Sequence, residues 1–325
     1  MALSFLTISH HALRSLQWVL LVAMAFTSCE KLENGVVNEI EFPEHDPRLA
    51  VTMFVSPGDT VLYASIYQSA SITDTAGSVP LTQATLKLTQ GNTLLAEGDS
   101  SNWSEFPSGP WSSSALMEMS LDEPLDLQSG VVVLEVDASP LFEPLVVSEE
   151  VPEAPLVEHV FELFGDSSGY NHLLTVDLDN RPGVRDDYII YVEVELMKLL
   201  PDGEKLMYWW DVGSEAVRDP RLGYSSGCAC LLATDNGEDN VSMENILLEV
   251  EHVYEYDYYG EPIEPNYRLR VGRPAAALAN HFNSIDAYFD ALDNPFSEPT
   301  SVQGNIPDGF GIFGVSNGVV IPLTE

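Results

Sequence analysis

An alternation of apolar and polar residues with a period of two dominates the chain from about Leu49 onwards. "LAVTMFV" is followed by the turn sequence "SPGD" and then by "TVLYASIY", and "GVVVLEVDA" has the same pattern further along. "ATLKLTQGNTLLAEG" predicts a hairpin that turns at Gln90-Gly91-Asn92. Because successive side chains of a strand point to opposite faces of its sheet, each of these strands has one apolar face. Short strands separated by turns predict an immunoglobulin-like β-sandwich over residues 46–152.

The β pattern continues after the acidic segment "SEEVPEAPLVEH", whose two prolines we take as a domain boundary. Further strands are expected in "HVFELF", "HLLTVDL", "DYIIYVEVELMKL", "KLMYWWDV" and "NILLEVEHVYEY". In "YVEVELMKL" the glutamates alternate with apolar residues, which is typical of a half-buried strand with one solvated face. Residues 153–325 are therefore predicted to form a second β-rich domain.

One segment of this second domain has the period of a helix. Its apolar residues recur at intervals of four and three and form a single stripe, made of Leu278, Phe282, Ile285, Phe289 and Leu292. Pro274 suits a first helical turn, and Asn294-Pro295 would end the helix. We predict a helix over about 274–292 that packs across a sheet. The predicted fold class is mainly β, with an N-terminal immunoglobulin-like β-sandwich followed by a second β-rich domain that carries one amphipathic helix.

The charge balance of the chain argues against nucleic acid as a partner. The 325 residues contain 13 Lys and Arg against 51 Asp and Glu, a formal net charge of -38. A surface this acidic repels nucleic acid and anionic lipid headgroups. The hydrophobic content of 45% is that of a folded protein and not of a disordered acidic tail.

The first residues have the features of a lipoprotein signal. The apolar run "LQWVLLVAMAF" is too short to span a bilayer comfortably, and it ends in "FTSC", which places Cys29 directly after a small residue. We predict that residues 1–28 are a signal peptide and that Cys29 receives the lipid, palmitate among its acyl chains. Residues 29–45 are then an acidic tether to the membrane.

The sequence "NIPDGFGIFG" has the G-x-G-x-x-G spacing of a dinucleotide-binding loop at Gly309, Gly311 and Gly314. Such a loop follows a strand, opens a helix and needs an acidic residue about twenty positions further on. Too few residues remain after Gly314 for that unit, so we expect these glycines to allow turns or close backbone approach. A second turn is predicted at Ser316-Asn317-Gly318.

Candidate catalytic and metal-binding groups are few. "GYSSG" places Ser225 in the G-x-S-x-G pattern of a hydrolase nucleophile, but neither a preceding strand nor a following helix is expected there. Cys228 and Cys230 in "CAC" favour a local disulfide in an oxidising envelope, with soft-metal capture as the alternative. The histidines have no metal-ligand spacing, and we predict no metal, no cofactor and no enzymatic activity.

Three arginines cluster in "NYRLRVGR", in a chain with few cations. A hairpin between "LLEVEHVYEY" and "NYRLRV" would place Arg268 and Arg270 opposite acidic residues of the first strand, namely Glu249, Glu251 or Glu255. We prefer such charge pairs to an anion-binding site.

Aromatic residues concentrate in the same part of the chain. The candidate ligand contacts are Trp209, Trp210, Tyr254 and Tyr256. On an exposed surface they could stack on sugars or contact a partner protein, whereas in the interior they would belong to the core. The sequence leaves both alternatives open.

Four segments occur in a fixed order: "SCEK", "VSPGDTV", "SIDAYFDAL" and the tail "NPFSEPTSVQGNIPDGFGIFG". Together they resemble the Bacteroidota outer-membrane lipoproteins of domain-of-unknown-function family 4249, over nearly the whole mature chain. The resemblance implies a lipid-anchored protein on the periplasmic or cell-surface face of the outer membrane. Members are often encoded beside TonB-dependent receptors, and no catalytic residue is established for them.

We therefore expect a non-enzymatic envelope lipoprotein that is accessory to a TonB-dependent outer-membrane transporter, through ligand capture or receptor docking. A surface glycan-binding protein or adhesin is the first alternative. A serine hydrolase that uses Ser225 is the second alternative.

Overall fold

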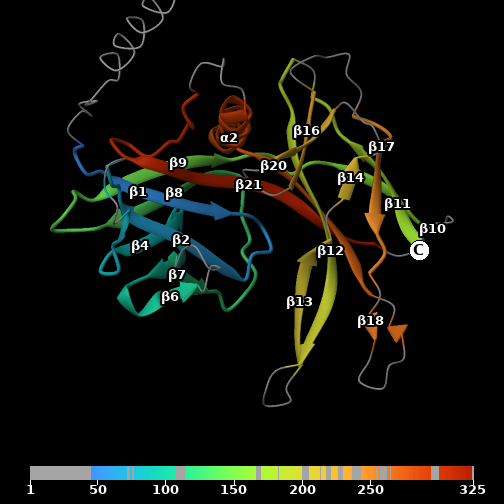
Figure 1. The fold of residues 1–325 in the computed structure, drawn as a ribbon, viewed down its shortest axis with the longest axis horizontal. Helices are drawn as coiled ribbons and strands as arrows, with labels where there is room; N and C mark the ends of the chain where they lie inside the picture. The colour runs from blue at the N-terminus through green and yellow to red at the C-terminus, as the bar shows by residue number, and fades with distance from the viewer. Residues whose placement is uncertain are drawn as a thin grey trace, which may run out of the picture. The chain divides into compact units, whose positions relative to one another are not determined.

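Strands make up most of the structure, a computed structural model, and one long helix stands out among the residues that it describes (Figure 1). The described residues are 45–71, 74, 77–106, 114–165, 170–181, 183–199, 205–212, 214–216, 221–225, 230–235, 243–253, 255–256, 262–263, 265–293 and 300–323. The predicted mainly β fold with an amphipathic helix is confirmed. Cys29 and the predicted signal peptide lie outside the described residues.

The first part of the chain forms two groups of hydrogen-bonded strands. The first group has the order β1-β2-β7-β6, with β3 beside β2, and the second has the order β5-β4-β8-β9. Their bounds are β1 Leu49–Val55, β2 Val61–Gln68, β3 Val79–Pro80, β4 Thr85–Gln90, β5 Thr93–Gly98, β6 Trp103–Phe106, β7 Ser114–Ser120, β8 Gly130–Asp137 and β9 Leu145–Val151. A short 3-10 helix, Ser100–Asn102, precedes β6.

Alternating apolar residues of these strands form a single cluster, which we call the N-terminal core. It contains Val51, Leu88 and Leu134, none of which is exposed to solvent. The strand β1 has buried residues at every second position, as its sequence pattern predicts. The predicted hairpin at Gln90-Gly91-Asn92 is confirmed, because β4 and β5 pair on either side of it and Gly91 has a φ of 59°.

The second part of the chain adds another sheet and extends the first. The order β10-β11-β17-β14 forms a separate sheet, whereas β15-β16-β12-β20-β21 continues into β1, and β13 pairs with β12. The bounds are β10 Val157–Gly165, β11 Tyr170–Leu178, β12 Asp187–Leu199, β13 Lys205–Asp211, β14 Ser214–Ala216, β15 Leu222–Ser225, β16 Cys230–Thr234, β17 Ile246–Glu251, β18 Glu255–Tyr256, β19 Pro262–Ile263, β20 Tyr267–Pro274 and β21 Phe310–Leu323.

A second cluster of apolar side chains lies between these two sheets, and we call it the C-terminal core. It includes Leu174 and Leu248 of the smaller sheet and Val192 and Leu269 of the larger one. These residues alternate with partly exposed ones along their strands, which gives the large sheet an opposite face that is free to contact other elements.

The long strand β21 joins the two parts. Residues 310–315 pair in parallel with β1, and residues 316–323 pair antiparallel with β20. The turn predicted at Ser316-Asn317-Gly318 is wrong, because these residues lie inside the strand where it passes from one partner to the other. The same strand thus supplies side chains to both cores, and the domain boundary at residues 152–153 stays a prediction.

Two glycines of the G-x-G-x-x-G sequence are required by close approach, as predicted. A Cβ on Gly311 would lie 2.1 Å from the carbonyl oxygen of Val51, and Gly311 has a φ of 95°. A Cβ on Gly314 would lie 2.7 Å from Leu278 of the helix. The spacing therefore serves the packing of β21 against β1 and the helix, and it opens no nucleotide-binding helix.

The helix α2, Ala276–Asp293, matches the predicted range closely. Its first residues bury Leu278 and Phe282 against the large sheet, on the face opposite the C-terminal core, where Ile189 and Cys230 complete a small cluster. The stripe is exposed toward its other end, at Phe289 and Leu292. None of the helices in the described ranges combines the length and hydropathy that a membrane span requires.

The hairpin predicted between "LLEVEHVYEY" and "NYRLRV" is wrong in its main pairing. The strand β17 pairs with β11 and β14, and β20 pairs with β12 and β21. Among the described residues of this region, only the short strands β18 and β19 form a hairpin. The apolar residues of β17 and of β20 both pack in the C-terminal core, but the two strands belong to different sheets.

Candidate functional site

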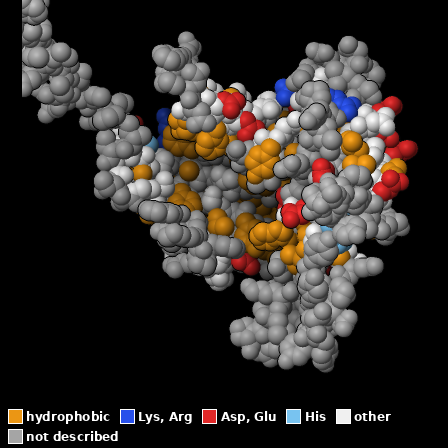
Figure 2. Space-filling view, turned by 45° about the vertical axis from the view of Figure 1, so that its right-hand side comes forward, with side chains coloured by type: hydrophobic (Ala, Val, Ile, Leu, Met, Phe, Trp, Pro, Cys, Tyr) orange, Lys and Arg blue, Asp and Glu red, His pale blue; other side chains and the backbone are white. Residues whose placement is uncertain are grey.

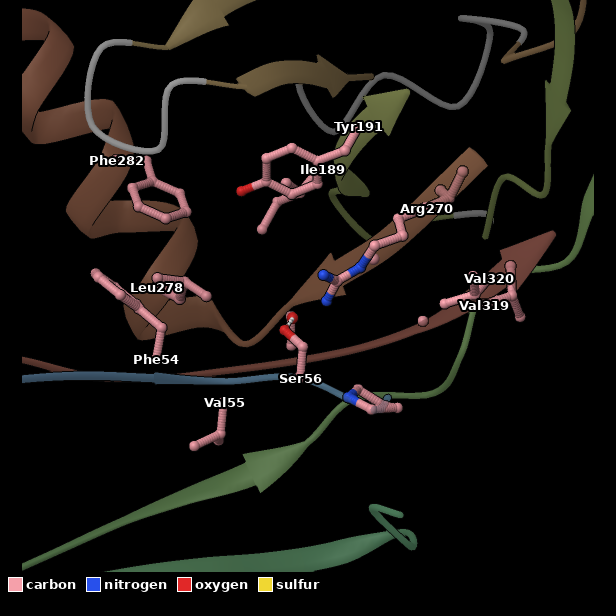
Figure 3. Close-up of a pocket in the computed structure, with 15 residues that line it drawn as sticks. Phe54, Val55, Ser56, Ile189, Tyr191, Arg270, Leu278, Phe282, Val319 and Val320 are labelled. Atoms are coloured by element: carbon pink, nitrogen blue, oxygen red, sulfur yellow. Dashed lines mark hydrogen bonds between the residues drawn. The ribbon is translucent and has the colours of Figure 1, made fainter. Parts of the chain in front are cut away.

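A cavity of about 210 Å³ lies where the end of β1, the strands β12, β20 and β21, and the helix α2 come together (Figure 3). Its walls are mostly apolar: Phe54, Val55, Ile189, Leu278, Phe282, Val319 and Val320. Its polar lining groups are Ser56, Tyr191, Arg270 and Ser316. A concave apolar site with a few convergent polar groups is the common form of a small-molecule site. Figure 2 shows hydrophobic side chains gathered around a hollow of the surface, with acidic side chains near it.

Strand register places Tyr191, Arg270 and Val320 of the cavity on one face of the large sheet. Tyr191 of β12 pairs with Arg270 of β20, and Arg270 pairs with Val320 of β21. Ile189 pairs with Gly272 two positions along, and both residues line the cavity. Because residues two apart share a face, alternation along these three strands is sufficient to assemble this wall.

The arginines of β20 form ion pairs, but with other partners than those predicted. The Nε of Arg268 lies 2.5 Å from Glu193, and Arg270 lies 3.2 Å from Asp59 and 3.7 Å from Glu193. The expected partners on β17 and β18 are wrong because β20 pairs with β12, which carries Glu193. The solvated face predicted for β12 is thus partly covered, and the Glu193 side chain is only 13% exposed.

Burial shifts the titration of two groups at the cavity. It raises the pKa of Asp59 above its usual range, although the neighbouring Arg270 opposes this shift. Asp59 also accepts a hydrogen bond of 2.8 Å from the backbone N–H of Ser56. Burial raises the pKa of Tyr191 to about 12, so its hydroxyl stays protonated at neutral pH. The hydroxyls of Ser56 and Ser316 lie 2.5 Å apart.

The two tryptophans among the predicted aromatic contacts do not lie on one surface. Trp209 and Trp210 are neighbours in β13, so their indole rings point to opposite faces of the sheet. Trp210 is 60% exposed, whereas the ring of Trp209 lies 4.0 Å from the guanidinium carbon of Arg268. Tyr254 lies outside the described residues, and Tyr256 is placed in β18 without a described side chain. Their role in ligand contact stays a prediction.

Ser225 does not have the surroundings of a hydrolase nucleophile. It is fully buried at the end of β15, where it pairs with Cys230 of β16. The element that follows β15 among the described residues is a strand, whereas a nucleophile elbow leads into a helix. Cys230 is held in a disulfide. The other predicted member of that pair, Cys228, lies outside the described residues.

A second cavity, of about 540 Å³, lies between the start of α2 and the end of β9. Its charged lining groups are Arg181, Arg185, Arg273, Glu149, Glu150, Glu153 and Asp187. The arginines are already neutralised by carboxylates: Arg181 lies 2.6 Å from Asp186, and Arg185 lies 2.9 Å from Asp187. About half of the residues that line this cavity are charged, whereas the smaller cavity has a mostly apolar wall with few polar groups, so we favour the smaller cavity as the candidate site.

Two histidines meet at the edge of the C-terminal core. The Nε2 of His172 lies 2.9 Å from the Nδ1 of His252, and the His172 ring stacks on Phe161 at 4.5 Å. Burial lowers the pKa of His172 to about 4, and the neighbouring His252 makes a smaller contribution in the same direction. Within the described ranges no three His, Cys, Asp or Glu side chains converge in a way that could hold a metal ion.

Sequence reasoning did not find the cavity. Asp59 and Arg270 are 211 positions apart, and Tyr191 belongs to a third segment. The one signal available was the scarcity of cations. Because the chain has few Lys and Arg residues, its acidic side chains are expected to gather around the arginines of "RLRVGR". The chain matches no protein-family model and no curated protein sequence.

Proposed function

We propose that this chain is a non-enzymatic envelope lipoprotein that captures a small ligand in the cavity beside α2, as an accessory to a TonB-dependent outer-membrane transporter. The observation that carries the ligand-capture part is the cavity itself, with an apolar wall and the polar groups Tyr191 and Arg270. The lipid anchor at Cys29 and the resemblance to domain-of-unknown-function family 4249 support the location and the partner.

We also infer that residues 46–152 form an immunoglobulin-like sandwich. In chain order, the immunoglobulin strands A, B, C, C′, D, E, F and G correspond to β1, β2, β4, β5, β6, β7, β8 and β9. The two sheets then have the orders A-B-E-D and C′-C-F-G. The A-B-E-D and C-F-G arrangement is that of constant-type immunoglobulin domains. Sandwiches of this kind are binding modules on many surfaces, which agrees with a non-enzymatic role.

Ligand capture is tested by thermal unfolding of the purified mature chain with a library of small organic acids, amines and alcohols. A ligand present at about 100 times its Kd should raise the Tm by roughly 5 °C or more. The matched control is Val320→Trp, because Val320 is 44% exposed at the cavity and a larger side chain would fill the space without disturbing a core. Ligand capture is wrong if no compound raises the Tm, or if every stabilising compound acts equally on the control.

The anchor and the partner need separate tests in cells. Palmitate labelling should be lost in Cys29→Ser and retained in Cys228→Ser, and the first variant should leave the membrane fraction. Cross-linking and affinity purification from membranes should recover a TonB-dependent receptor. A protein that remains monomeric in membranes and never recovers a receptor would contradict the accessory role.

The glycan-binding alternative depends on Trp210, the one tryptophan of the pair with an exposed ring. A glycan array that compares the wild-type chain with Trp210→Ala and Trp209→Ala would reveal it. Binding that is lost in the first variant alone would favour this alternative over capture in the cavity.

A further inference from the structure

The polar end of the cavity is a guanidinium with unused donors. Arg270 carries five N–H groups, and one of them makes a hydrogen bond within the described part of the structure, to Asp59 at 3.2 Å. Glu193, at 3.7 Å, is beyond hydrogen-bond distance and is held by Arg268. Figure 3 shows the guanidinium reaching into the cavity from β20. The remaining donors are therefore available to an acceptor that enters there.

Tyr191 supplies a second donor to the cavity. Its ring centre lies 6.0 Å from the guanidinium carbon of Arg270, and its hydroxyl points into the space in front of Phe282 (Figure 3). The phenol is protonated at neutral pH, since burial raises its pKa to about 12. A planar anion between these two groups would accept hydrogen bonds from both.

The other end of the cavity is apolar and limits the size of the ligand. Phe54, Leu278 and Phe282 face one another across it (Figure 3), and the rings of Phe54 and Phe282 are 5.9 Å apart. An engineered apolar cavity of about 150 Å³ holds benzene. The volume of about 210 Å³ then suits a ring or a branched chain with a small head group, roughly ten non-hydrogen atoms in all.

The charges at the site favour an anion over a cation. The neighbouring groups Arg268, Arg270, Glu193, Asp59 and Asp211 sum to a net charge of -1, but the one charged group among the described residues that line the space is the cation Arg270. Asp59 is the internal competitor for Arg270. It keeps a hydrogen bond from the backbone of Ser56, and burial makes its charged form costly, so a second anion can take its place on Arg270.

We infer that the cavity binds a small monocarboxylate with an aromatic or branched apolar body, whose carboxylate is held by Arg270 and Tyr191 in competition with Asp59. This inference rests on the proposed function and names the ligand class for the same site. The guanidinium presents paired N–H groups that match the two oxygens of a carboxylate, and the apolar body occupies the space in front of α2.

Calorimetric titration of the mature chain with three probes of one shape tests the inference. The probes are phenylacetate, its uncharged analogue phenylacetamide and the cation phenethylammonium. Phenylacetate should bind at least about tenfold more tightly than the amide, because charge-assisted hydrogen bonds to arginine are the stronger ones. Phenethylammonium should not bind. Equal affinity for the acid and the amide would overturn the inference.

Two variants assign the effect to named groups. Asp59→Asn removes the competing charge at nearly constant shape, and it should tighten phenylacetate binding by about tenfold without changing amide binding. Arg270→Gln should weaken phenylacetate binding by about tenfold or more. Its matched control is Arg185→Gln, an exposed arginine that pairs with Asp187 and does not line this cavity, and which should change affinity by less than about twofold.

The outcomes separate this inference from the function on which it rests. If other compounds bind and are blocked by Val320→Trp, while phenylacetate is not preferred over its amide, ligand capture stands and the carboxylate class is wrong. If Asp59→Asn leaves phenylacetate affinity unchanged, the competition with Asp59 is wrong. If no compound in the library binds at all, the proposed function itself fails.

Discussion

The first part of the chain and the second part are built from similar strands, but they differ in the polarity of their buried side chains. Among the described residues, every buried polar or charged side chain follows residue 170: His172, Asp186, Ser225, Asp235, Arg273, His281, Ser284 and Ser316. Among the described residues from 45 to 165, the buried side chains are apolar, and none is polar or charged. An apolar interior needs only the correct alternation and volume, whereas buried polar groups must each find a partner.

The difference locates the chemistry of the molecule. The largest pKa shifts among the described residues are those of His172, Tyr188 and Tyr191, all in the second region, and Tyr191 lines the candidate cavity. The N-terminal core contributes the end of β1 to the cavity but none of its ion-paired arginines. We infer that the first region is a support and that binding depends on the second.

The variant with the largest expected effect on this contrast is Arg273→Met. The Arg273 side chain is 3% exposed, and it contacts Asp179 at 2.9 Å and Asp186 at 3.3 Å. Removing the cation takes away a positive partner of the Asp179 and Asp186 carboxylates, which are then only partly neutralised. We therefore expect a loss of about 3–5 kcal/mol in the free energy of unfolding, measured with urea.

The matched control is Arg185→Met. Arg185 is 45% exposed and pairs with Asp187, so its removal should cost less than about 1 kcal/mol. If the two variants lose the same stability, the polar interior of the second region has no special role.

Acid should weaken the second region through His172. Its pKa is about 4 in the folded chain and about 6.5 when unfolded, so the unfolded state takes up the proton first as the pH falls. The stability that this group contributes is present above pH 6.5, and about 3 kcal/mol of it should be lost between pH 6.5 and pH 4.

His172→Phe should remove that loss, since phenylalanine keeps the stack on Phe161 and does not titrate. Urea unfolding of both chains at a series of pH values measures the difference. Parallel pH profiles for the two proteins would contradict this assignment.

The strand β21, which joins the two regions, is tested by Gly311→Ala. Its φ of 95° is unfavourable for alanine, and the added Cβ would lie 2.1 Å from the carbonyl oxygen of Val51. We expect a loss of about 2–3 kcal/mol. Gly91→Ala is the control, since Gly91 has a φ of 59° but open space around it, and it should lose only about 1 kcal/mol. Equal losses would mean that close approach to β1 is unimportant.

The smallest effect is expected for the stability of Asp59→Asn. Because the pKa of Asp59 is raised in the folded chain, ionisation of this group opposes folding, and the penalty disappears as the pH falls through the raised pKa. The variant should therefore be at least as stable as the wild type at pH 7, with a gain of less than about 1 kcal/mol in the free energy of unfolding. This gain should shrink toward pH 4. A clear loss of stability at pH 7 would mean that Asp59 is mainly a structural partner of Arg270.

Period-two alternation was sufficient to predict β1, the β4–β5 hairpin and the alternating face of β12. The stripe from Leu278 to Leu292 was sufficient to predict α2. Both patterns are local, because they follow from the geometry of a single strand or helix. Pairing between strands is not local, and this is why the partners of Arg268 and the turn at Ser316-Asn317-Gly318 were predicted wrongly.

The sequence by itself determined the mainly β class, the helix and the need for small residues near Gly311 and Gly314. Only the tertiary structure decided that Tyr191 and Arg270 line one cavity and that Asp59, from a third distant segment, pairs with Arg270 beside it. The physical reason is that alternation tells each strand which side is apolar, whereas the choice of neighbouring strand depends on how all the apolar faces are buried together.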